Sequence, residues 1–567
     1  MTLKTPRIVT GADLARRHFV QGVAAATAVG ALALPQGRIW AQATPNNHPE
    51  LRGTEFDLEV AALPVNFTGR AAVATAINGI VPGPVLRVRE GDTITLRVTN
   101  RLGEPTSVHW HGMILDTSMD GVPGFSFPGI APGETFTYRF TVRQTGTYWY
   151  HAHSLHEQTG TYGAIVAEPR APDPLTVGRD YTVLLSDWTD EAPLDVYRQL
   201  KKMGGYYNFG QPTARDFVAD VSRKGLSAAL GKRRMWTTSR MSPTDFADVS
   251  ATTFTYLMNG SNPAMNWTAI ANAGERVRLR FVGAGTATFF DVRIPGLKLS
   301  VIATDGQPTE PVEVDEFRIA PGETYDVVVT MPENRAYTIF AQSMDRTGFA
   351  RGTLAPRAGM EAPVPRNDAP VWLEEVDMMG AMAGMATMPD MDSGPRAPHA
   401  RTEYGPGVDM RVDYPRTNLD DPGVGLRNNG RRVLTYADLH TIGGSIDTRA
   451  PSRDIELHLT GNMDRFVWSI DGVTLSDAKP VHFRSGERLR VILHNDTMMT
   501  HPMHLHGMWS ELETPNGAFQ ARKHTISVQP AQRISFAVTA DALGRWAFHC
   551  HLLYHMAAGM FREVIVA

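Results

Sequence analysis

The sequence predicts an all-β protein made of three β-sandwich domains, and the main observation behind this prediction is a degenerate threefold repeat. Segments 91–100, 274–283 and 486–495 each begin with glycine and then alternate apolar and polar residues, which is the pattern of a half-buried strand after a turn. A second alternating segment follows at 132–140, 321–329 and 530–538, so that the paired segments start 41, 47 and 44 residues apart. Three copies of one β-sandwich are the simplest explanation.

The domain boundaries follow from the repeat. We predict domain 1 at residues 44–172, domain 2 at 173–356 and domain 3 at 430–567. Many short strands separated by Pro and Gly turns fit antiparallel sandwiches. Residues 195–250 interrupt the strand pattern of domain 2 and are expected to be helical or an insertion. Residues 357–429 are rich in Pro, Gly, Met and charge, show little periodicity, and are predicted to form a long linker.

The first 43 residues are predicted to be a twin-arginine signal peptide. Arg16 and Arg17 form the arginine pair, an apolar run follows at 23–34, and residues 41–43 read Ala-Gln-Ala, a cleavage site. The run is too short to span a bilayer, although a short N-terminal membrane anchor is the alternative interpretation. We therefore expect a bacterial protein that is exported in its folded state to the periplasm and has no membrane span in its mature form.

The composition narrows the function classes. A net charge of −4 over 567 residues indicates no nucleic-acid or anionic-membrane partner. A hydrophobic content of 42% and a mean hydropathy of −0.22 describe a soluble globular protein. The chain carries 19 histidines, 25 methionines and one cysteine, which is a heavy load of metal-capable side chains. A single cysteine cannot form an internal disulfide, so its thiol is either reactive or a metal ligand.

Cys550 is that cysteine, and its segment 549–560 reads His-Cys-His-Leu-Leu-Tyr-His-Met-Ala-Ala-Gly-Met. Histidine and cysteine with a distant methionine are the ligand set of a blue-copper electron-transfer site. In an extended strand neighbouring side chains point to opposite faces, so Cys550 is expected on one face and His549 and His551 on the other. One strand can then bind a metal through sulfur and present two imidazoles to a second metal site behind it.

Three further histidine clusters occur at 109–111 (His-Trp-His), 151–153 (His-Ala-His) and 501–506 (His-Pro-Met-His-Leu-His). An HxH pair on a strand points both rings to one face. Domains 1 and 3 carry clusters at equivalent repeat positions and domain 2 carries none, so two facing domains are expected to enclose a group of metals. A single HxH is more often solvated or satisfied in a core, but four clusters at homologous positions argue against that interpretation. The histidines without such a pattern are assigned structural or surface roles: His156, His399, His440, His458, His482, His494 and His524.

The four motifs closely resemble those of the three-domain multicopper oxidases, which include laccases, ascorbate oxidase and bacterial copper-efflux oxidases. The resemblance covers nearly the whole mature chain and implies three cupredoxin-like Greek-key β-sandwich domains with four copper ions. It implies a type 1 copper in domain 3 on His501, Cys550 and His555, with Met560 as the weak axial ligand. The type 2 copper would take His109 and His504. The type 3 pair would take His111, His151, His153, His506, His549 and His551.

The resemblance also implies the reaction. Substrate gives one electron at a time to the type 1 site, where a thiolate and two imidazoles let copper cycle between Cu(I) and Cu(II) with little rearrangement. The electron then passes through Cys550 to His549 or His551. The trinuclear cluster collects four electrons and reduces the co-substrate O2 to two waters. A thioether axial ligand indicates a moderate reduction potential.

Asp120 is the predicted proton donor for oxygen reduction. It lies eleven residues after His109 and matches the family position of a proton-relay carboxylate near the type 2 copper. The alternative is an ordinary turn aspartate before Gly121. Several relatives carry a second carboxylate directly after the last type 1 histidine, but this chain has Met556 there, which puts an acidic relay at that position in doubt.

A methionine tract in the predicted linker indicates the substrate. Thioethers are soft ligands that select Cu(I), so the tract predicts Cu(I) recruitment. The alternative is a methionine-lined helix face packed on the core, but the segment lacks the Leu, Ile and Phe that usually accompany core methionines. With the export signal, the chain is similar to the periplasmic copper resistance protein A type, whose members are understood to oxidise toxic Cu(I) and to sequester copper. The tract consists of Met378, Met379, Met382, Met385, Met388 and Met391.

Three functions remain open at this point: oxidation of Cu(I) in copper tolerance, laccase-type oxidation of small phenols or aromatic amines, and periplasmic copper sequestration with incidental oxidase activity. An open pocket at the type 1 site would favour phenols, whereas a covered site lined by Met and Asp would favour Cu(I). We expect a monomer, and other periplasmic copper-handling proteins are candidate partners although no motif marks a surface for them. Asp464 and Asp477 are candidates for an acidic substrate site near the type 1 copper. Four methionines flank His501 and either dock Cu(I) or pack around the copper: Met498, Met499, Met503 and Met508.

Overall fold

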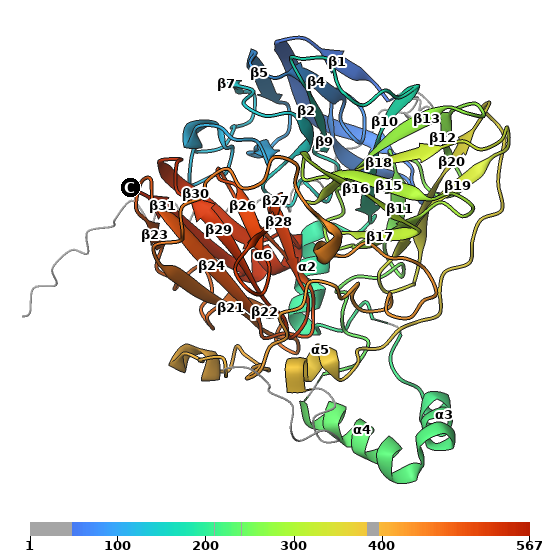
Figure 1. Cartoon of the computed structure of the whole chain (residues 1–567), viewed down its shortest axis with the longest axis vertical. Helices are drawn as coiled ribbons and strands as arrows, with labels where there is room; N and C mark the ends of the chain where they lie inside the picture. The colour runs from blue at the N-terminus through green and yellow to red at the C-terminus, as the bar shows by residue number, and fades with distance from the viewer. Residues whose placement is uncertain (1–47, 209, 240, 383–395) are drawn as a thin grey trace, which may run out of the picture.

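Figure 1 shows the computed structural model of the chain, which describes residues 48–208, 210–239, 241–382 and 396–567. Within these residues the strands form six sheets, two for each predicted domain, so the all-β prediction is confirmed. The predicted signal peptide and the methionines Met385, Met388 and Met391 lie outside the described residues.

Domain 1 pairs a five-stranded sheet with a four-stranded sheet. The first has the order β1 (Glu50–Arg52), β4 (Val85–Arg89), β9 (Tyr162–Glu168), β8 (Gly146–His151) and β6 (His109–His111). The second has the order β3 (Ala72–Ile77), β2 (Glu55–Val65), β5 (Thr93–Asn100) and β7 (Thr135–Thr141). Every second residue of β5 is buried, because one face of this strand packs into the sandwich.

Domain 2 has a six-stranded and a five-stranded sheet. The first has the order β11 (Thr255–Met258), β10 (Arg179–Trp188), β13 (Arg276–Gly283), β18 (Thr324–Thr330), β15 (Leu299–Thr304) and β16 (Gln307–Val314). The second has the order β12 (Trp267–Ile270), β20 (Phe349–Ala355), β19 (Tyr337–Ser343), β14 (Phe290–Arg293) and β17 (Glu316–Ile319).

Domain 3 repeats this arrangement. Its six-stranded sheet has the order β22 (Val467–Ile470), β21 (Asp454–Asn462), β24 (Arg488–Asn495), β29 (Arg533–Thr539), β26 (Ser510–Glu513) and β27 (Phe519–Lys523). Its five-stranded sheet has the order β23 (Val481–Phe483), β31 (Phe561–Val566), β30 (Gly544–Cys550), β25 (His501–Leu505) and β28 (Thr525–Val528).

The threefold sequence repeat forms the same substructure each time. The two repeat segments are antiparallel neighbours, β5 with β7, β13 with β18 and β24 with β29. A third strand lies parallel to the first, β2 beside β5, β10 beside β13 and β21 beside β24. The prediction of antiparallel sandwiches is wrong for these pairs. Between the two parallel strands the chain passes through the facing sheet, at β4, β12 or β23, and it therefore returns in the same direction.

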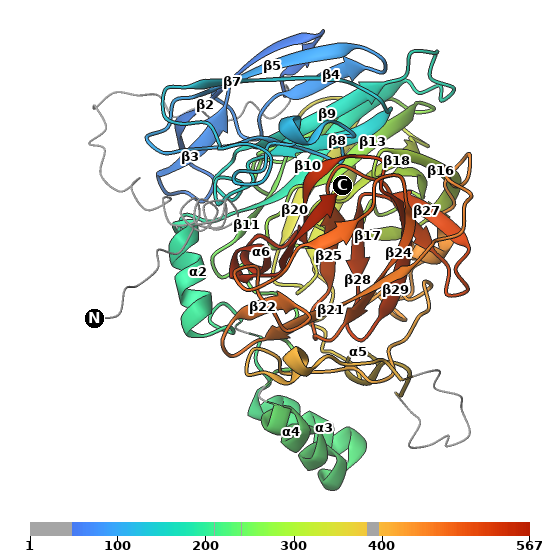
Figure 2. The same cartoon turned by 90° about the vertical axis from the view of Figure 1, so that its left-hand side faces the viewer.

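The stretch that interrupts domain 2 contains helices, in agreement with the first of the two alternatives predicted for residues 195–250. It contains α2 (Pro193–Lys202), α3 (Ala214–Lys224) and α4 (Leu226–Ser239), and α3 starts at a capping box of Thr213 and Asp216. Figure 2 shows that α3 and α4 form a hairpin standing away from the sandwiches. Two shorter helices are α5 (Val376–Met379) and α6 (Leu553–Ala558). Among the described residues, none of the helices has the length and apolar character that crossing a membrane would need.

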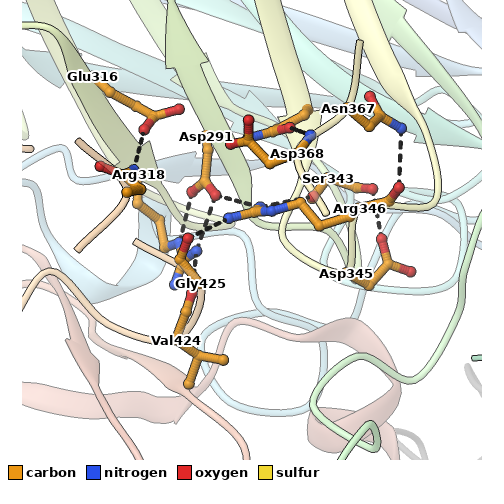
Figure 3. Close-up of polar contacts among 12 residues, drawn as sticks. Asp291, Glu316, Arg318, Ser343, Asp345, Arg346, Asn367, Asp368, Val424 and Gly425 are labelled. Atoms are coloured by element: carbon orange, nitrogen blue, oxygen red, sulfur yellow. Dashed lines mark hydrogen bonds and ion pairs between the residues drawn. The ribbon is translucent and has the colours of Figure 1, made fainter. Parts of the chain in front are cut away.

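The end of the predicted linker is held against domain 2 by a buried ion-pair network (Figure 3). Asp291 on β14 accepts hydrogen bonds from Arg318 at 2.7 and 3.0 Å and from Arg346 at 2.5 Å. The same two arginines donate to the linker carbonyls of Val424 at 2.8 Å and Gly425 at 3.0 Å. Burial disfavours the charge on Asp291, but the two guanidinium groups hold its pKa below its usual range. The network therefore fixes this part of the linker on the sheet.

We predict that Asp291→Ala destabilises domain 2 by about 3–5 kcal/mol, because it leaves two buried guanidinium groups without a carboxylate. The measurement is the midpoint of urea unfolding, combined with limited proteolysis, which should now cleave near Val424. Lys298→Ala is the control. The Lys298 side chain is 53% exposed, so its ion pair with Asp315 should contribute little to stability. An equal loss in the two variants would contradict the prediction.

Candidate metal centres

Strand β30 presents potential metal donors on both of its faces. The Sγ atom of Cys550 lies 3.6 Å from Nδ1 of His501 and 3.8 Å from Nδ1 of His555, and these two nitrogens are 3.2 Å apart. The preceding residue, His549, points to the other side, as strand alternation requires. Its Nε2 atom lies 3.2 Å from Nε2 of His153 and 3.1 Å from Nε2 of His506.

Cys550, His501 and His555, which we name the cysteine triad, fit one metal ion. Bond lengths of about 2.0 Å to nitrogen and about 2.3 Å to sulfur separate the donors of a trigonal site by about 3.5 Å. The observed separations of 3.2 to 3.8 Å agree with this geometry. Burial raises the pKa of the Cys550 thiol and lowers the pKa of His501 well below its usual value. A metal ion that binds here must therefore displace the thiol proton, while the imidazole is already neutral.

Met560 is held beside the triad by the turn that follows α6. The N–H of Met560 donates to the carbonyl of His555 at 3.0 Å, and the N–H of Cys550 donates to the carbonyl of Met560 at 3.1 Å. Gly559 permits this turn, since its φ is +124° and a Cβ atom there would lie 2.8 Å from the carbonyl oxygen of Trp468. Met560 is fully buried.

Both imidazoles of the triad are covered on their outer edges. Nε2 of His501 lies 2.7 Å from Oγ1 of Thr497, and Nε2 of His555 lies 2.8 Å from a carboxylate oxygen of Asp248. Trp468 stacks on His555 with 3.8 Å between the ring centroids. The Asp248 carboxylate favours the tautomer with a proton on Nε2, which leaves Nδ1 for a metal. Asp248 belongs to the stretch that interrupts domain 2, and no sequence signal marked it.

Eight histidines of domains 1 and 3 form a second centre, which we name the inner histidine cluster. Pairing of β6 with β8 sets His109 opposite His151, and pairing of β25 with β30 sets His504 opposite His549. His111 and His504 stack across the domain boundary, with ring centroids 3.8 Å apart. All eight are buried: His109, His111, His151, His153, His504, His506, His549 and His551.

Hydrogen bonds orient these rings with one nitrogen directed inwards. Nδ1 of His109 lies 2.7 Å from the carbonyl oxygen of Asp120, and Nδ1 of His504 lies 2.6 Å from that of His524. An imidazole whose Nδ1–H is bound in this way keeps the Nε2 lone pair for a metal. Buried polar atoms are rarely left without a partner, so the cluster fits a group of enclosed metal ions. The Nε2 atoms without a hydrogen-bond partner belong to His109, His151, His504 and His551.

Asp120 contacts two neighbouring imidazoles of the inner cluster, one from domain 1 and one from domain 3. One of its carboxylate oxygens lies 2.9 Å from Nδ1 of His506, and its backbone carbonyl faces His109. The turn expected as the alternative also exists, because Gly121 has a φ of +80° and a Cβ atom there would lie 1.9 Å from the carbonyl oxygen of Val108. The side chain is only 2% exposed, so it is not an ordinary surface turn residue.

Glu157 and His524 are two polar residues of this centre that sequence reasoning missed. A carboxylate oxygen of Glu157 lies 2.8 Å from Nδ1 of His151, and burial together with nearby Asp187 raises the pKa of Glu157 well above its usual value. His524 is buried with its ring centroid 4.8 Å from that of His111, which excludes a surface role and leaves the structural role of the two that were assigned to it. The only signal for Glu157 was its position four residues after an HxH pair, and His524 had none.

The methionines divide into two groups. Met378 lies on α5 and packs with Met241 and Met410 in one apolar cluster, whereas Met379 is 43% exposed. Met382 ends the short 3-10 helix Gly380–Met382 and is half-buried. The methionines near His501 are all buried in the domain core, which supports packing rather than docking: Met498, Met499, Met503 and Met508. Asp464 and Asp477 are exposed and make no contact with the triad among the described residues.

Comparisons with known proteins all identify the same family. Family models described as multicopper oxidase match residues 59–172, 179–358 and 448–567. A copper resistance protein A homolog of Pseudomonas syringae pv. tomato is 54% identical, with 97% of this chain and 99% of that protein covered. A copper resistance protein A of Escherichia coli is 52% identical with the same coverage.

Solved structures of lower identity show the same fold. The crystal structure of Fet3p, a multicopper oxidase that functions in iron import, matches with a TM-score of 0.65 at 19% identity, covering 91% of this chain and 90% of that one. The laccase from Botrytis aclada matches with a TM-score of 0.62 at 21% identity, covering 92% and 88%.

We predict that the copper-free protein loses stability as the pH falls from about 7 to 5. Burial lowers the pKa of His111, His151 and His504 well below 6.5 in the folded chain, so the unfolded chain binds more protons and is favoured as the pH falls below 6.5. For His549, whose pKa falls from 6.5 to about 4, this amounts to about 2 kcal/mol at pH 5. The measurement is the urea midpoint between pH 8 and pH 5. His549→Gln should flatten the slope, and a midpoint that does not change with pH would contradict the prediction.

Proposed function

The chain belongs to the multicopper oxidase family, and we propose that this oxidoreductase oxidises Cu(I) to Cu(II) in copper tolerance and reduces O2 to water. The relatives named copper resistance protein A, at 52–54% identity over 97% of the chain, support this assignment. The predicted export signal supports a periplasmic location, and the monomer expected from the sequence remains a prediction.

The two donor sets support the expected division of four copper ions. The cysteine triad, with Met560 as axial ligand, would hold the type 1 ion. His109 and His504 would hold the type 2 ion, and the other six members of the inner histidine cluster would hold the type 3 pair. Bound copper would supply one-electron transfer at the triad and four-electron reduction of O2 at the cluster. The polypeptide links the two centres directly, because Cys550 and His549 are neighbours on β30.

The cover over the triad is the observation that favours Cu(I) over phenols. A phenol must bring its ring to the edge of a type 1 imidazole, but both His501 and His555 are fully buried. Their outer nitrogens already face Thr497 and the carboxylate of Asp248. A small cation can be attracted to a negative charge at this position, whereas an aromatic ring finds the edge blocked.

Two buried acids are candidate proton donors for O2 reduction. Asp120 lies against His506 and Glu157 against His151, so each touches an imidazole of the inner cluster from outside. Hydrogen bonding to these imidazoles places a proton close to the reacting centre. This chain has Met556 where several relatives carry a second carboxylate, and Glu157 is the candidate for that second acid.

We expect the copper-loaded protein to take up O2 rapidly with Cu(I) and slowly with a methoxyphenol, because the triad is covered against rings. Replacing the six methionines between Met378 and Met391 by leucine should weaken uptake with Cu(I) at low concentration and leave uptake with the phenol unchanged. Oxygen-electrode measurements on both donors test this.

Cys550→Ser is the control without a type 1 ligand and should be inactive with both donors. Strong uptake with the phenol, unaffected by the leucine substitutions, would make this protein a laccase. If cells that carry Cys550→Ser keep their copper tolerance, sequestration is favoured over catalysis.

We further predict that Asp120→Asn lowers the rate of O2 reduction by about 100-fold, the usual scale for loss of a positioned acid. The rate should become less sensitive to pH, and Glu157→Gln should show the same effect. The control is Asp116→Asn in the same segment, whose carboxylate is 80% exposed. Stopped-flow reoxidation of the reduced protein isolates this step, and a normal rate in both buried-acid variants would exclude the relay.

A further inference from the structure

A second cluster of histidines and carboxylates lies outside the centres described above. It consists of His399, Glu403, His458 and Asp496, whose side chains are only 1–5% exposed. His399 comes from the predicted linker, and Glu403 from the short 3-10 helix Arg401–Tyr404 that follows it. His458 lies on β21, and Asp496 directly follows β24. Three separate segments therefore converge here on four buried metal-capable groups.

The four donor atoms form a closed ring in which nitrogen and oxygen alternate. Oε2 of Glu403 lies 2.7 Å from Nδ1 of His399 and 3.4 Å from Nδ1 of His458. Oδ2 of Asp496 lies 2.6 Å from Nδ1 of His458 and 3.7 Å from Nδ1 of His399. The two longer separations fall within the 3.1 to 3.8 Å between neighbouring donor atoms in the cysteine triad and around His549, and the two shorter ones are hydrogen-bond contacts. The ring is therefore compact enough for one ion bound by all four groups.

The surroundings hold each carboxylate in place and leave one oxygen for the ring. Oε1 of Glu403 accepts the N–H of Ala400 at 2.9 Å, and Oδ1 of Asp496 accepts the N–H of Val412 at 2.7 Å. Metal-binding carboxylates are characteristically oriented by such bonds. Nε2 of His399 is buried without a hydrogen-bond partner, 3.5 Å from a carboxylate oxygen of Asp413.

We propose that His399, Glu403, His458 and Asp496 form a fifth copper site, which binds Cu²⁺. Glu403 and Asp496 each direct one carboxylate oxygen into the ring, and a divalent cation bound between them would pair with both carboxylates. Imidazole and carboxylate donors suit Cu²⁺ rather than Cu(I), and Cu²⁺ binds most tightly among the common divalent ions of the first transition row.

The position of the site suggests what it does. Thr497, the residue after Asp496, contacts the type 1 ligand His501 at 2.7 Å. Val412, bonded to Asp496, belongs to the apolar cluster that contains Met378 and Met410. The apolar cluster with these two thioethers therefore adjoins the ring at Asp496, and the ring adjoins the type 1 ligand His501 through Thr497. The site would hold the Cu²⁺ that the oxidase produces, and this role rests on the proposed function. The binding of Cu²⁺ itself does not depend on it.

The experiment compares copper content in the holoprotein and in the double variant His399→Gln/Glu403→Gln. Both are equilibrated with Cu²⁺ under air, and total copper and EPR-detectable copper per chain are counted. The wild-type chain should hold one more Cu²⁺ than the variant, and the blue absorption of the type 1 site should be equal in both. His399→Gln alone, a change in the linker outside the sandwich core, serves if the double variant does not fold.

His494→Gln is the matched control. His494 is also buried, pairs with His458 across the two parallel strands and stacks on its ring at 4.5 Å, but its Nε2 faces Glu456. This variant should keep the extra copper. Equal copper in the wild type and the double variant would overturn the proposal, and the four residues would then form only two histidine–carboxylate pairs without a metal. Loss of the extra copper in His494→Gln would also overturn it, and so would preference for Zn²⁺ when both ions are offered.

Oxygen uptake on the same samples separates this proposal from the proposed function. Uptake with Cu(I) but no extra copper means that the fifth site fails and the oxidase assignment stands. Extra copper in a protein that oxidises only the phenol means that the site stands and the Cu(I) assignment fails.

Discussion

The meeting of eight buried imidazoles between domains 1 and 3 is the constraint on which the rest of the structure depends. Four of their Nε2 atoms have no hydrogen-bond partner, and each such atom costs about 1–3 kcal/mol unless a metal binds it. The inner edges of the two domains must therefore meet in one register, with the β6–β8 pair facing the β25–β30 pair. Strand β30 then couples the centres, since its alternation sends Cys550 to the triad and His549 to the cluster.

Domain 2 provides no ligand to either centre among the described residues, yet it encloses both. Asp248 covers His555 in the triad. At the inner cluster the turn at Gly322 approaches His551 so closely that a Cβ atom would lie 2.9 Å from the imidazole ring. Lys523 of domain 3 is fully buried against Asp305 at 3.1 Å, which fixes the neighbouring His524. Domain 2 thus shields both centres and limits which electron donors reach the cysteine triad.

The predicted linker is part of the same machinery. The Asp291 network binds the end of the linker to domain 2, and further upstream Met378 packs in the apolar cluster that contains Val412. Between these points it delivers His399 and Glu403 to β21 and β24. A segment without strand periodicity therefore brings Met378 and the ring residues His399 and Glu403 against domain 3.

The sequence by itself determined the three sandwiches and the main candidate ligands, because these features are local. Glycine-led alternation at 91–100, 274–283 and 486–495 defined the strands, and the spacing in the segment around Cys550 defined which side chains share a face. The tertiary structure alone decided the parallel pairs and the contacts of Asp248, Glu157 and the His399 ring. Periodicity states which face a side chain occupies, but the distant residue opposite it depends on how the domains pack, and that packing leaves no local pattern.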